Sequence, residues 1–144
     1  MANDKEGRMK KHKLLKMRAK AWLQDLGYNQ VQFEKPFILP PDHPEWEYEQ
    51  PVKLDIFGIH PIDGTTIGIE CGYVDSDKAR KLSCQLDLLM IWPHERYCNR
   101  PPFQGDRPVR YTDNSEWNNA LRQTSFEGLV RGGGPGWTKT AWER

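Results

Sequence analysis

Residues 52–71 constrain the fold most strongly, because two apolar runs are joined there by a turn typical of β-hairpins. The first run covers residues 52–59 and the second covers residues 66–71, and both contain the branched residues that strands favour. Between them stands Asp63-Gly64, the strongest short hairpin signal in the chain. The pattern therefore predicts two neighbouring antiparallel strands.

Upstream of this hairpin, the spacing of apolar residues predicts a helix and then a strand. The helix covers residues 8–26, and residues 30–39 form a strand that we expect to break near Pro36. Residues 40–50 are rich in proline and acids and indicate a loop. The apolar stripe of the helix consists of Leu15, Ala19, Trp22, Leu23 and Leu26.

Downstream, a short helix over residues 76–85 precedes an apolar strand over residues 87–92. The predicted fold class is therefore α/β, with a helix-strand-strand-strand-helix-strand core and a mixed central sheet. We assign this core to residues 8–93. Residues 94–144 are rich in Pro, Gly and Arg and predict an irregular extension, with one further helix over residues 115–123.

Composition excludes two classes of protein. No apolar run approaches the roughly 20 residues that a membrane span needs, so we expect no membrane association. The three cysteines are odd in number and form no CxxC pair, which argues against a disulfide scaffold. The N-terminus is charged and no apolar signal region follows it. The expected location is the cytoplasm, where thiols stay reduced.

Charge is unevenly distributed along a chain whose formal net charge is only +1. Residues 1–20 hold eight Lys and Arg against two Asp and Glu, a local charge of +6. Residues 21–93 hold five against twelve, a local charge of -7. A basic end joined to an acidic middle suits a nucleic-acid binder with a cation site, although a solvated lysine-rich helix would look the same.

One acid stands in each strand of the predicted hairpin. Asp55 lies in the first strand and Glu70 in the second, and a carboxylate in an apolar strand is costly unless it is paired or ligated. Paired carboxylates bind hard divalent cations, so we expect Mg²⁺ or Mn²⁺ here. Gly68 and Gly72 share the strand face of Glu70 and predict an open shelf for a ligand. The alternative is two acids that simply face water.

With Asp and Glu on consecutive strands and this order of elements, the chain resembles the PD-(D/E)xK nuclease superfamily, which includes restriction endonucleases and archaeal-type Holliday junction resolvases. The resemblance covers residues 8–93 and rests on element order more than on the short motif. It implies that Asp55 and Glu70 are catalytic and hold the metal. It also implies that the main-chain carbonyl of Cys71 joins them.

Gly72 departs from the motif, because the superfamily has a lysine at that position. Such a lysine positions the attacking water and stabilises charge on the phosphate. Some members supply the cation from the following helix, which here offers Lys78 and Lys81. Lys53, on the strand face of Asp55, is a further candidate.

The basic face of the first helix is the predicted nucleic-acid contact, with DNA favoured over RNA. Its cations would neutralise backbone phosphates. They are Lys10, Lys13, Lys16 and Lys20. The glycine-rich tail, with Trp137, Lys139, Trp142 and Arg144, suits single-stranded nucleic acid or serves as a flexible tail, and a partner protein or larger assembly would order it.

Two functions from different classes follow. The first is a nucleic-acid-binding, magnesium-dependent phosphodiesterase that hydrolyses DNA or RNA. The alternative is an inactive nuclease fold that serves as a structural or protein-docking subunit, with residues 40–50 and 94–144 as docking arms. Gly72 favours the second function, and the acid pair favours the first.

Overall fold

The computed structural model describes residues 2–122 of the chain, and side chains from residue 11 onward. The predicted order of elements is the order observed, with additions after residue 93. The elements are α1 (Ala2–Asp25), β1 (Gln30–Leu39), β2 (Gln50–Ile59), β3 (Thr66–Cys71), α2 (Ser76–Ser83), β4 (Leu88–Trp92), the 3₁₀ turn η1 (Glu95–Tyr97) and β5 (Val109–Arg110). Residues 115–122 form a last helical segment.

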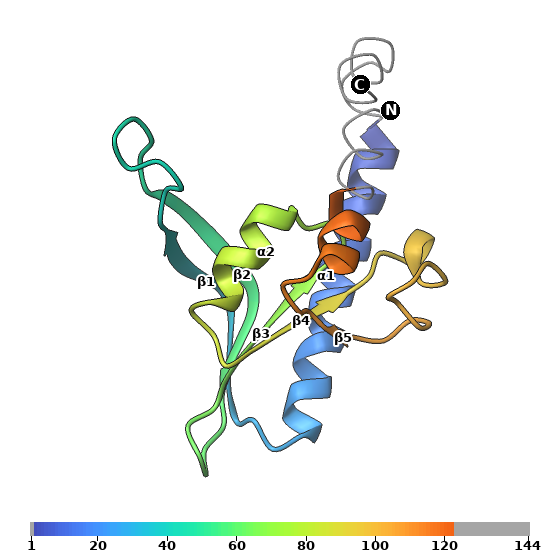
Figure 1. Cartoon of the computed structure of the whole chain (residues 1–144). Helices are drawn as coiled ribbons and strands as arrows, with labels where there is room; N and C mark the ends of the chain where they lie inside the picture. The colour runs from blue at the N-terminus through green and yellow to red at the C-terminus, as the bar shows by residue number, and fades with distance from the viewer. Residues whose placement is uncertain (1, 123–144) are drawn as a thin grey trace.

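The strands form one mixed sheet in the order β1-β2-β3-β4-β5 (Figure 1). β1, β2 and β3 pair antiparallel, β4 lies parallel to β3, and β5 is antiparallel to β4. The parallel pair needs a crossover connection, and α2 supplies it. The predicted α/β class with a mixed central sheet is therefore confirmed.

The hairpin predicted from Asp63-Gly64 is present. Ile59 pairs with Thr66, and the β2–β3 ladder runs from there to Ile56 opposite Ile69. Gly64 has a φ of +77°, which an L-residue rarely adopts. This turn sets the register that places Asp55 and Glu70 opposite each other, one step beyond the end of the ladder.

β1 corrects the expectation of a strand broken near Pro36. The strand is continuous, and Pro36 pairs with Lys53 of β2. The physical reason is its position, because β1 is the edge of the sheet and proline, which lacks an N–H, is tolerated there.

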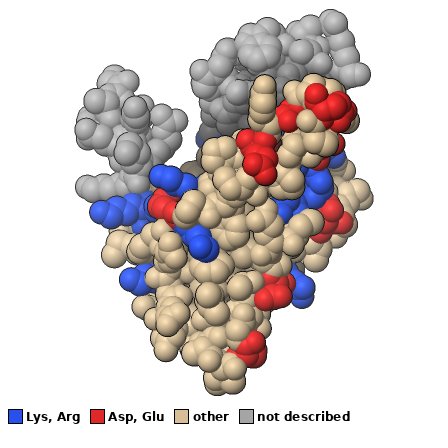
Figure 2. Space-filling model, turned by 90° about the vertical axis from the view of Figure 1, so that its left-hand side faces the viewer, with Lys and Arg blue, Asp and Glu red and all other residues tan. Residues whose placement is uncertain are grey.

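The loop between β1 and β2 projects away from the sheet (Figure 1). Trp46 and Tyr48 in this loop are 66% and 93% exposed. On the side of the molecule shown in Figure 2, acidic side chains gather in the upper part, the height at which this loop lies in Figure 1. The predicted loop is therefore an acidic projection that carries two exposed aromatic side chains.

Two cores lie on opposite faces of the sheet. Ile56 belongs to one core and Phe57 to the other, as expected for neighbouring residues of a strand. Ala19 and Leu23 of α1 pack in the core with Ile56, whereas Leu82 of α2 packs in the core with Phe57. The two helices therefore cover opposite faces of the sheet. Of the predicted stripe, Leu26 is the exception, because it follows the last residue of α1 and is 50% exposed.

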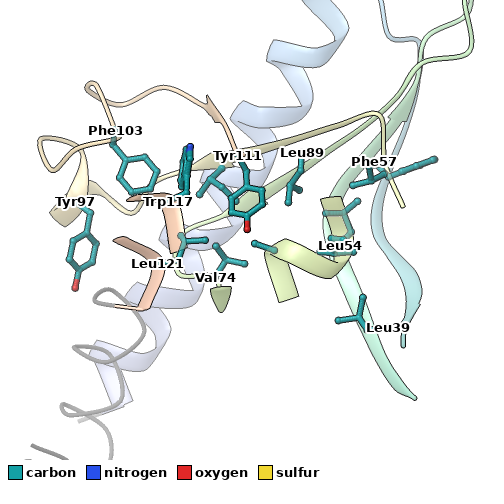
Figure 3. Packing of buried hydrophobic residues seen from close by; sticks show 14 residues of the cluster. Leu39, Leu54, Phe57, Val74, Leu89, Tyr97, Phe103, Tyr111, Trp117 and Leu121 are labelled. Carbon is teal, nitrogen blue, oxygen red and sulfur yellow. The ribbon is translucent and has the colours of Figure 1, made fainter. Parts of the chain in front are cut away.

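The predicted irregular extension contributes much of the second core (Figure 3). Tyr97, Phe103, Tyr111, Trp117 and Leu121 are all buried in it. β5 also extends the sheet beyond residue 93. The sequence did not predict this packing, because these residues are not spaced with the period of a strand or a helix. The tail predictions at Trp137, Lys139, Trp142 and Arg144 lie outside the described residues.

Among the described helices, none has the length and apolar character needed to cross a membrane.

Candidate active site

The two acids of the hairpin join β2 to β3 where the main-chain ladder stops. The Asp55 N–H donates to Glu70 Oε2 at 3.1 Å, and the Cys71 N–H donates to Asp55 Oδ2 at 2.8 Å. Each carboxylate thus accepts the amide of the opposite strand. This exchange explains why two acids are tolerated inside a sheet, since hydrogen bonding offsets much of the cost of burial.

A lysine of α2 completes the pair. Lys78 Nζ lies 2.6 Å from Glu70 Oε1 and donates to the Lys53 main-chain carbonyl at 3.0 Å. The start of the helix fixes this placement, because Asp75 caps it by accepting the Asp77 and Lys78 N–H groups. Lys78 therefore sits in the first turn of α2 with its side chain directed to the acid pair.

Lys81 does not share this position. Its Nζ lies 3.3 Å from Asp77 and 3.6 Å from Asp42, and neither acid belongs to the pair. Three residues along a helix add about 4.5 Å of rise and leave the side chain about 60° from the first direction. Of the two expected lysines, the structure thus brings Lys78 to the acid pair and places Lys81 beside Asp77 and Asp42. Lys53 contributes only its carbonyl among the contacts at the acid pair.

His12 of α1 is a neighbour that the sequence reasoning missed. Its Nε2 lies 3.5 Å from Asp55 Oδ2, and the side chain is 41% exposed. The signal was present, because His12 stands three residues before Leu15 and seven before Ala19, on the extension of the buried stripe. Only the packing of α1 against the sheet brings it to the acids.

The surroundings of the two carboxyl groups shift their pKa values in opposite directions. Burial, together with the Asp55 charge, raises the pKa of Glu70 to about 7, although Lys78 opposes the shift. Burial would also raise the pKa of Asp55, but His12 and the Cys71 N–H outweigh it and lower that pKa. In turn, Asp55 raises the pKa of His12 despite partial burial. At neutral pH, Asp55 therefore carries a negative charge, whereas Glu70 is partly protonated.

The glycines flanking Glu70 do not form the open shelf that we expected. A Cβ at Gly68 would lie 2.6 Å from the Leu86 side chain and 2.7 Å from that of Leu54. The Gly68 site is therefore filled by the core. Gly72 is roomier, since the nearest atom to a Cβ there is His12 Cδ2 at 3.8 Å, but its φ is +86°. A lysine at Gly72 would therefore be strained by the backbone, although the space around a Cβ there is open.

The oxygen donors fit magnesium better than a metal that needs a full protein cage. Across residues 2–122, no group of three His, Cys, Asp or Glu side chains is arranged to hold a metal. Mg²⁺ needs fewer protein ligands, because it keeps several of its waters and binds through one or two carboxylates. Asp55, Glu70 and the Cys71 carbonyl are the oxygen groups that would hold such an ion, and both Glu70 oxygens already have partners in the Asp55 N–H and Lys78 Nζ. The Cys71 side chain is buried in the core that α1 covers, and this burial raises the pKa of its thiol.

The predicted basic face of α1 is partly occupied. Lys16 pairs with Glu34 at 2.6 Å, and the Lys16 and Lys20 ammonium groups lie 5.9 and 5.3 Å from the Phe33 ring centre. Lys13 is exposed, and the side chain of Lys10 lies outside the described part of the chain. Whether these lysines bind nucleic acid stays a prediction.

Comparison of the chain with protein-family models, with curated proteins and with solved structures finds no match. Any functional conclusion therefore rests on the chemistry of this site.

Proposed function

We propose that the chain is a magnesium-dependent phosphodiesterase acting on nucleic acid, with Asp55, Glu70 and Lys78 as its catalytic residues. The observation that carries the proposal is the 2.6 Å contact between Lys78 Nζ and Glu70 Oε1. It places an ammonium group beside the acid pair although the motif position holds glycine. Two carboxylates and a cation held together are what metal-assisted phosphodiester hydrolysis requires.

The arrangement of the sheet supports the same proposal. An antiparallel β1-β2-β3 unit is followed by a crossover through α2 to a parallel β4, with α1 on the opposite face. This order is the one expected for a restriction-endonuclease-like core. In open α/β sheets, ligands bind at the carboxyl ends of the parallel strands, and Glu70 and Cys71 lie at that end of β3.

Each residue has a defined task in the proposed reaction. Asp55, Glu70 and the Cys71 carbonyl would hold Mg²⁺ or Mn²⁺, which when bound lowers the pKa of water and neutralises phosphate charge. Glu70 and the Lys53 carbonyl hold Lys78 in place with two of its three N–H donors. The third can donate to a phosphate oxygen as negative charge develops there.

Replacing Lys78 tests the proposal. Lys78→Met keeps the aliphatic stem and removes the charge, so metal-dependent cleavage should fall about 10²–10⁴-fold. Lys81→Met is the matched control, since it removes the same charge one turn away on α2, and it should keep most of the activity. Cleavage of labelled single-stranded, duplex and branched DNA and of RNA would be measured with Mg²⁺ and with Mn²⁺, alongside thermal unfolding of each variant. Equal loss in both variants, or no cleavage by the parent, would contradict the assignment.

One observation favours the second candidate function, a docking subunit. Trp46 and Tyr48 are large, exposed aromatic residues on a projecting loop, and such residues are enriched at protein interfaces. If the parent cleaves none of the substrates, this loop becomes the first surface to test for a partner protein.

A further inference from the structure

Two stacked aromatic rings lie just beyond the carboxyl ends of the parallel strands β3 and β4. Cys71 and Trp92 form the last pair of the β3–β4 ladder, and the Gly72 N–H donates to the Trp92 carbonyl at 2.8 Å. Two residues beyond each strand stand Tyr73 and His94. Their ring centres are 4.9 Å apart and their planes differ by 19°, which is a stacked arrangement.

The side chain of Tyr97 contacts both rings of the stack. The buried ring of Tyr97 meets Tyr73 edge-on at 5.5 Å and His94 at 6.4 Å. His94 also caps η1, because its Nδ1 accepts the Arg96 N–H at 3.2 Å. Burial lowers the pKa of His94, so the ring is neutral at physiological pH. Tyr73 nevertheless remains 43% exposed. The stack is thus both ordered and accessible.

The stack is close to the proposed catalytic residues. Tyr73 follows Glu70 by three positions, so their Cα atoms are at most about 11 Å apart. α1 spans the interval, since Lys11 contacts Glu95 beside the stack at 2.8 Å and His12 contacts Asp55 at 3.5 Å. The Lys11–Glu95 pair is exposed on both sides, and such pairs are weak enough to be exchanged for a phosphate contact.

We propose that the Tyr73–His94 stack binds an unpaired base of the substrate strand while the neighbouring phosphate lies at Asp55 and Glu70. This inference rests on the proposed function and names its substrate class: nucleic acid that is single-stranded at the site. Every base has a π-face, so stacking gives affinity without sequence preference. A preordered stack loses little conformational entropy when a base binds. In an intact duplex the bases are already stacked on each other and cannot use it.

Binding without divalent metal tests the stack separately from catalysis. The probe is a fluorescein-labelled oligodeoxynucleotide, single-stranded or annealed to its complement, and the readout is fluorescence anisotropy in EDTA. Tyr73→Leu removes the π-face but keeps apolar volume, and should weaken single-strand binding about 5–150-fold. Tyr73→Phe keeps the ring and is the matched control, which should bind like the parent. The parent should prefer the single strand over the duplex.

Each outcome decides one statement. Single-strand binding that is unchanged in Tyr73→Leu, or equal loss in Tyr73→Phe, would overturn the stack as the base site, as would a parent that prefers the duplex or binds neither probe. Thermal unfolding of each variant shows whether it is folded. Tyr73-dependent binding by a parent that cleaves nothing would retain the stack and reject the phosphodiesterase. If Tyr73→Leu binds the single strand normally and still cleaves it, the phosphodiesterase is retained and the stack is rejected as the base site.

Discussion

At the scale of single residues, Asp55 and Glu70 have two tasks at once. Their carboxylates accept the amides of the opposing strands, and they also gather the charge that a cation would neutralise. A structural role alone would be met by neutral amides, which accept the same hydrogen bonds. Burial and the Asp55 charge raise the pKa of Glu70 to about 7, so this side chain can exchange a proton near neutral pH, which an amide in its place could not do.

The pH dependence of stability follows from this pKa. Burial raises the pKa of Glu70 from 4.5 to about 7, so the folded protein holds a proton that the unfolded chain releases. Stability is then fully present below about pH 4.5 and is lost as pH rises through about 7. The raised pKa of His12 acts in the same direction at higher pH. We expect the metal-free protein to become less stable from pH 5 to pH 7, and Glu70→Gln to be flatter over that range.

Urea unfolding at several pH values measures this slope. His12→Asn serves as a control, because the pKa of His12 is raised from 6.5 and its contribution falls mostly above this range. A parent whose stability rises with pH, or a Glu70→Gln protein with the parental slope, would show that Glu70 is not held in its protonated form.

The candidate residues differ in how far the sequence could identify them. Asp55 and Glu70 could be identified from the sequence, because strand alternation and the single turn between the strands place them in register. Lys78 and Lys81 could not be separated, because the choice depends on how α2 is rotated against the sheet. His12 comes from a distant helix, and local periodicity does not report which strand a helix covers.

At the scale of elements, β3 is packed on both faces rather than open on one. Ile67, Ile69 and Cys71 are buried on one side, and Gly68 and Glu70 are buried on the other. Strand alternation correctly assigns residues to faces, but it does not say what covers each face. The expected shelf failed for this reason, since Leu54 and Leu86 occupy the space above Gly68.

Adding one methyl group at Gly68 tests this packing. A Cβ there would lie 2.6 and 2.7 Å from two leucine side chains, so Gly68→Ala should destabilise the protein by about 1–3 kcal/mol. Gly58→Ala is the matched control on the neighbouring strand, where the nearest atom would be 3.2 Å away, and it should cost less. The free energy of unfolding in denaturant measures both changes. Equal costs in the two variants would mean that Gly68 is no more confined than Gly58.

At the scale of the whole molecule, residues 94–122 belong to the same folding unit as the predicted core. Trp117 packs against Phe103 and Tyr111 at ring-centre distances of 5.4 and 5.6 Å. The Tyr111 hydroxyl donates to Asn118 Oδ1 at 2.7 Å. These contacts cover the face of the sheet that also carries α2. The sequence did not reveal them because the segment has few regular elements.

Cutting the chain after residue 93 should therefore prevent cooperative folding. The fragment would leave one face of the sheet without its aromatic cover. The milder change Trp117→Ala should fold but lose about 3–5 kcal/mol. Thermal unfolding followed by circular dichroism distinguishes these states. A sharp, parental transition in the fragment ending at residue 93 would show that the domain does end there.

The measurement that tests the central claim most directly is a calorimetric titration of the protein with Mn²⁺ at neutral pH, which reports binding to the acid pair. The parent should bind one ion, and Asp55→Asn combined with Glu70→Gln should abolish that binding while the strand-joining hydrogen bonds and the fold are retained. Parental binding in the double variant, or no binding by the folded parent, would contradict the claim and leave Asp55 and Glu70 as residues that only hold two strands together.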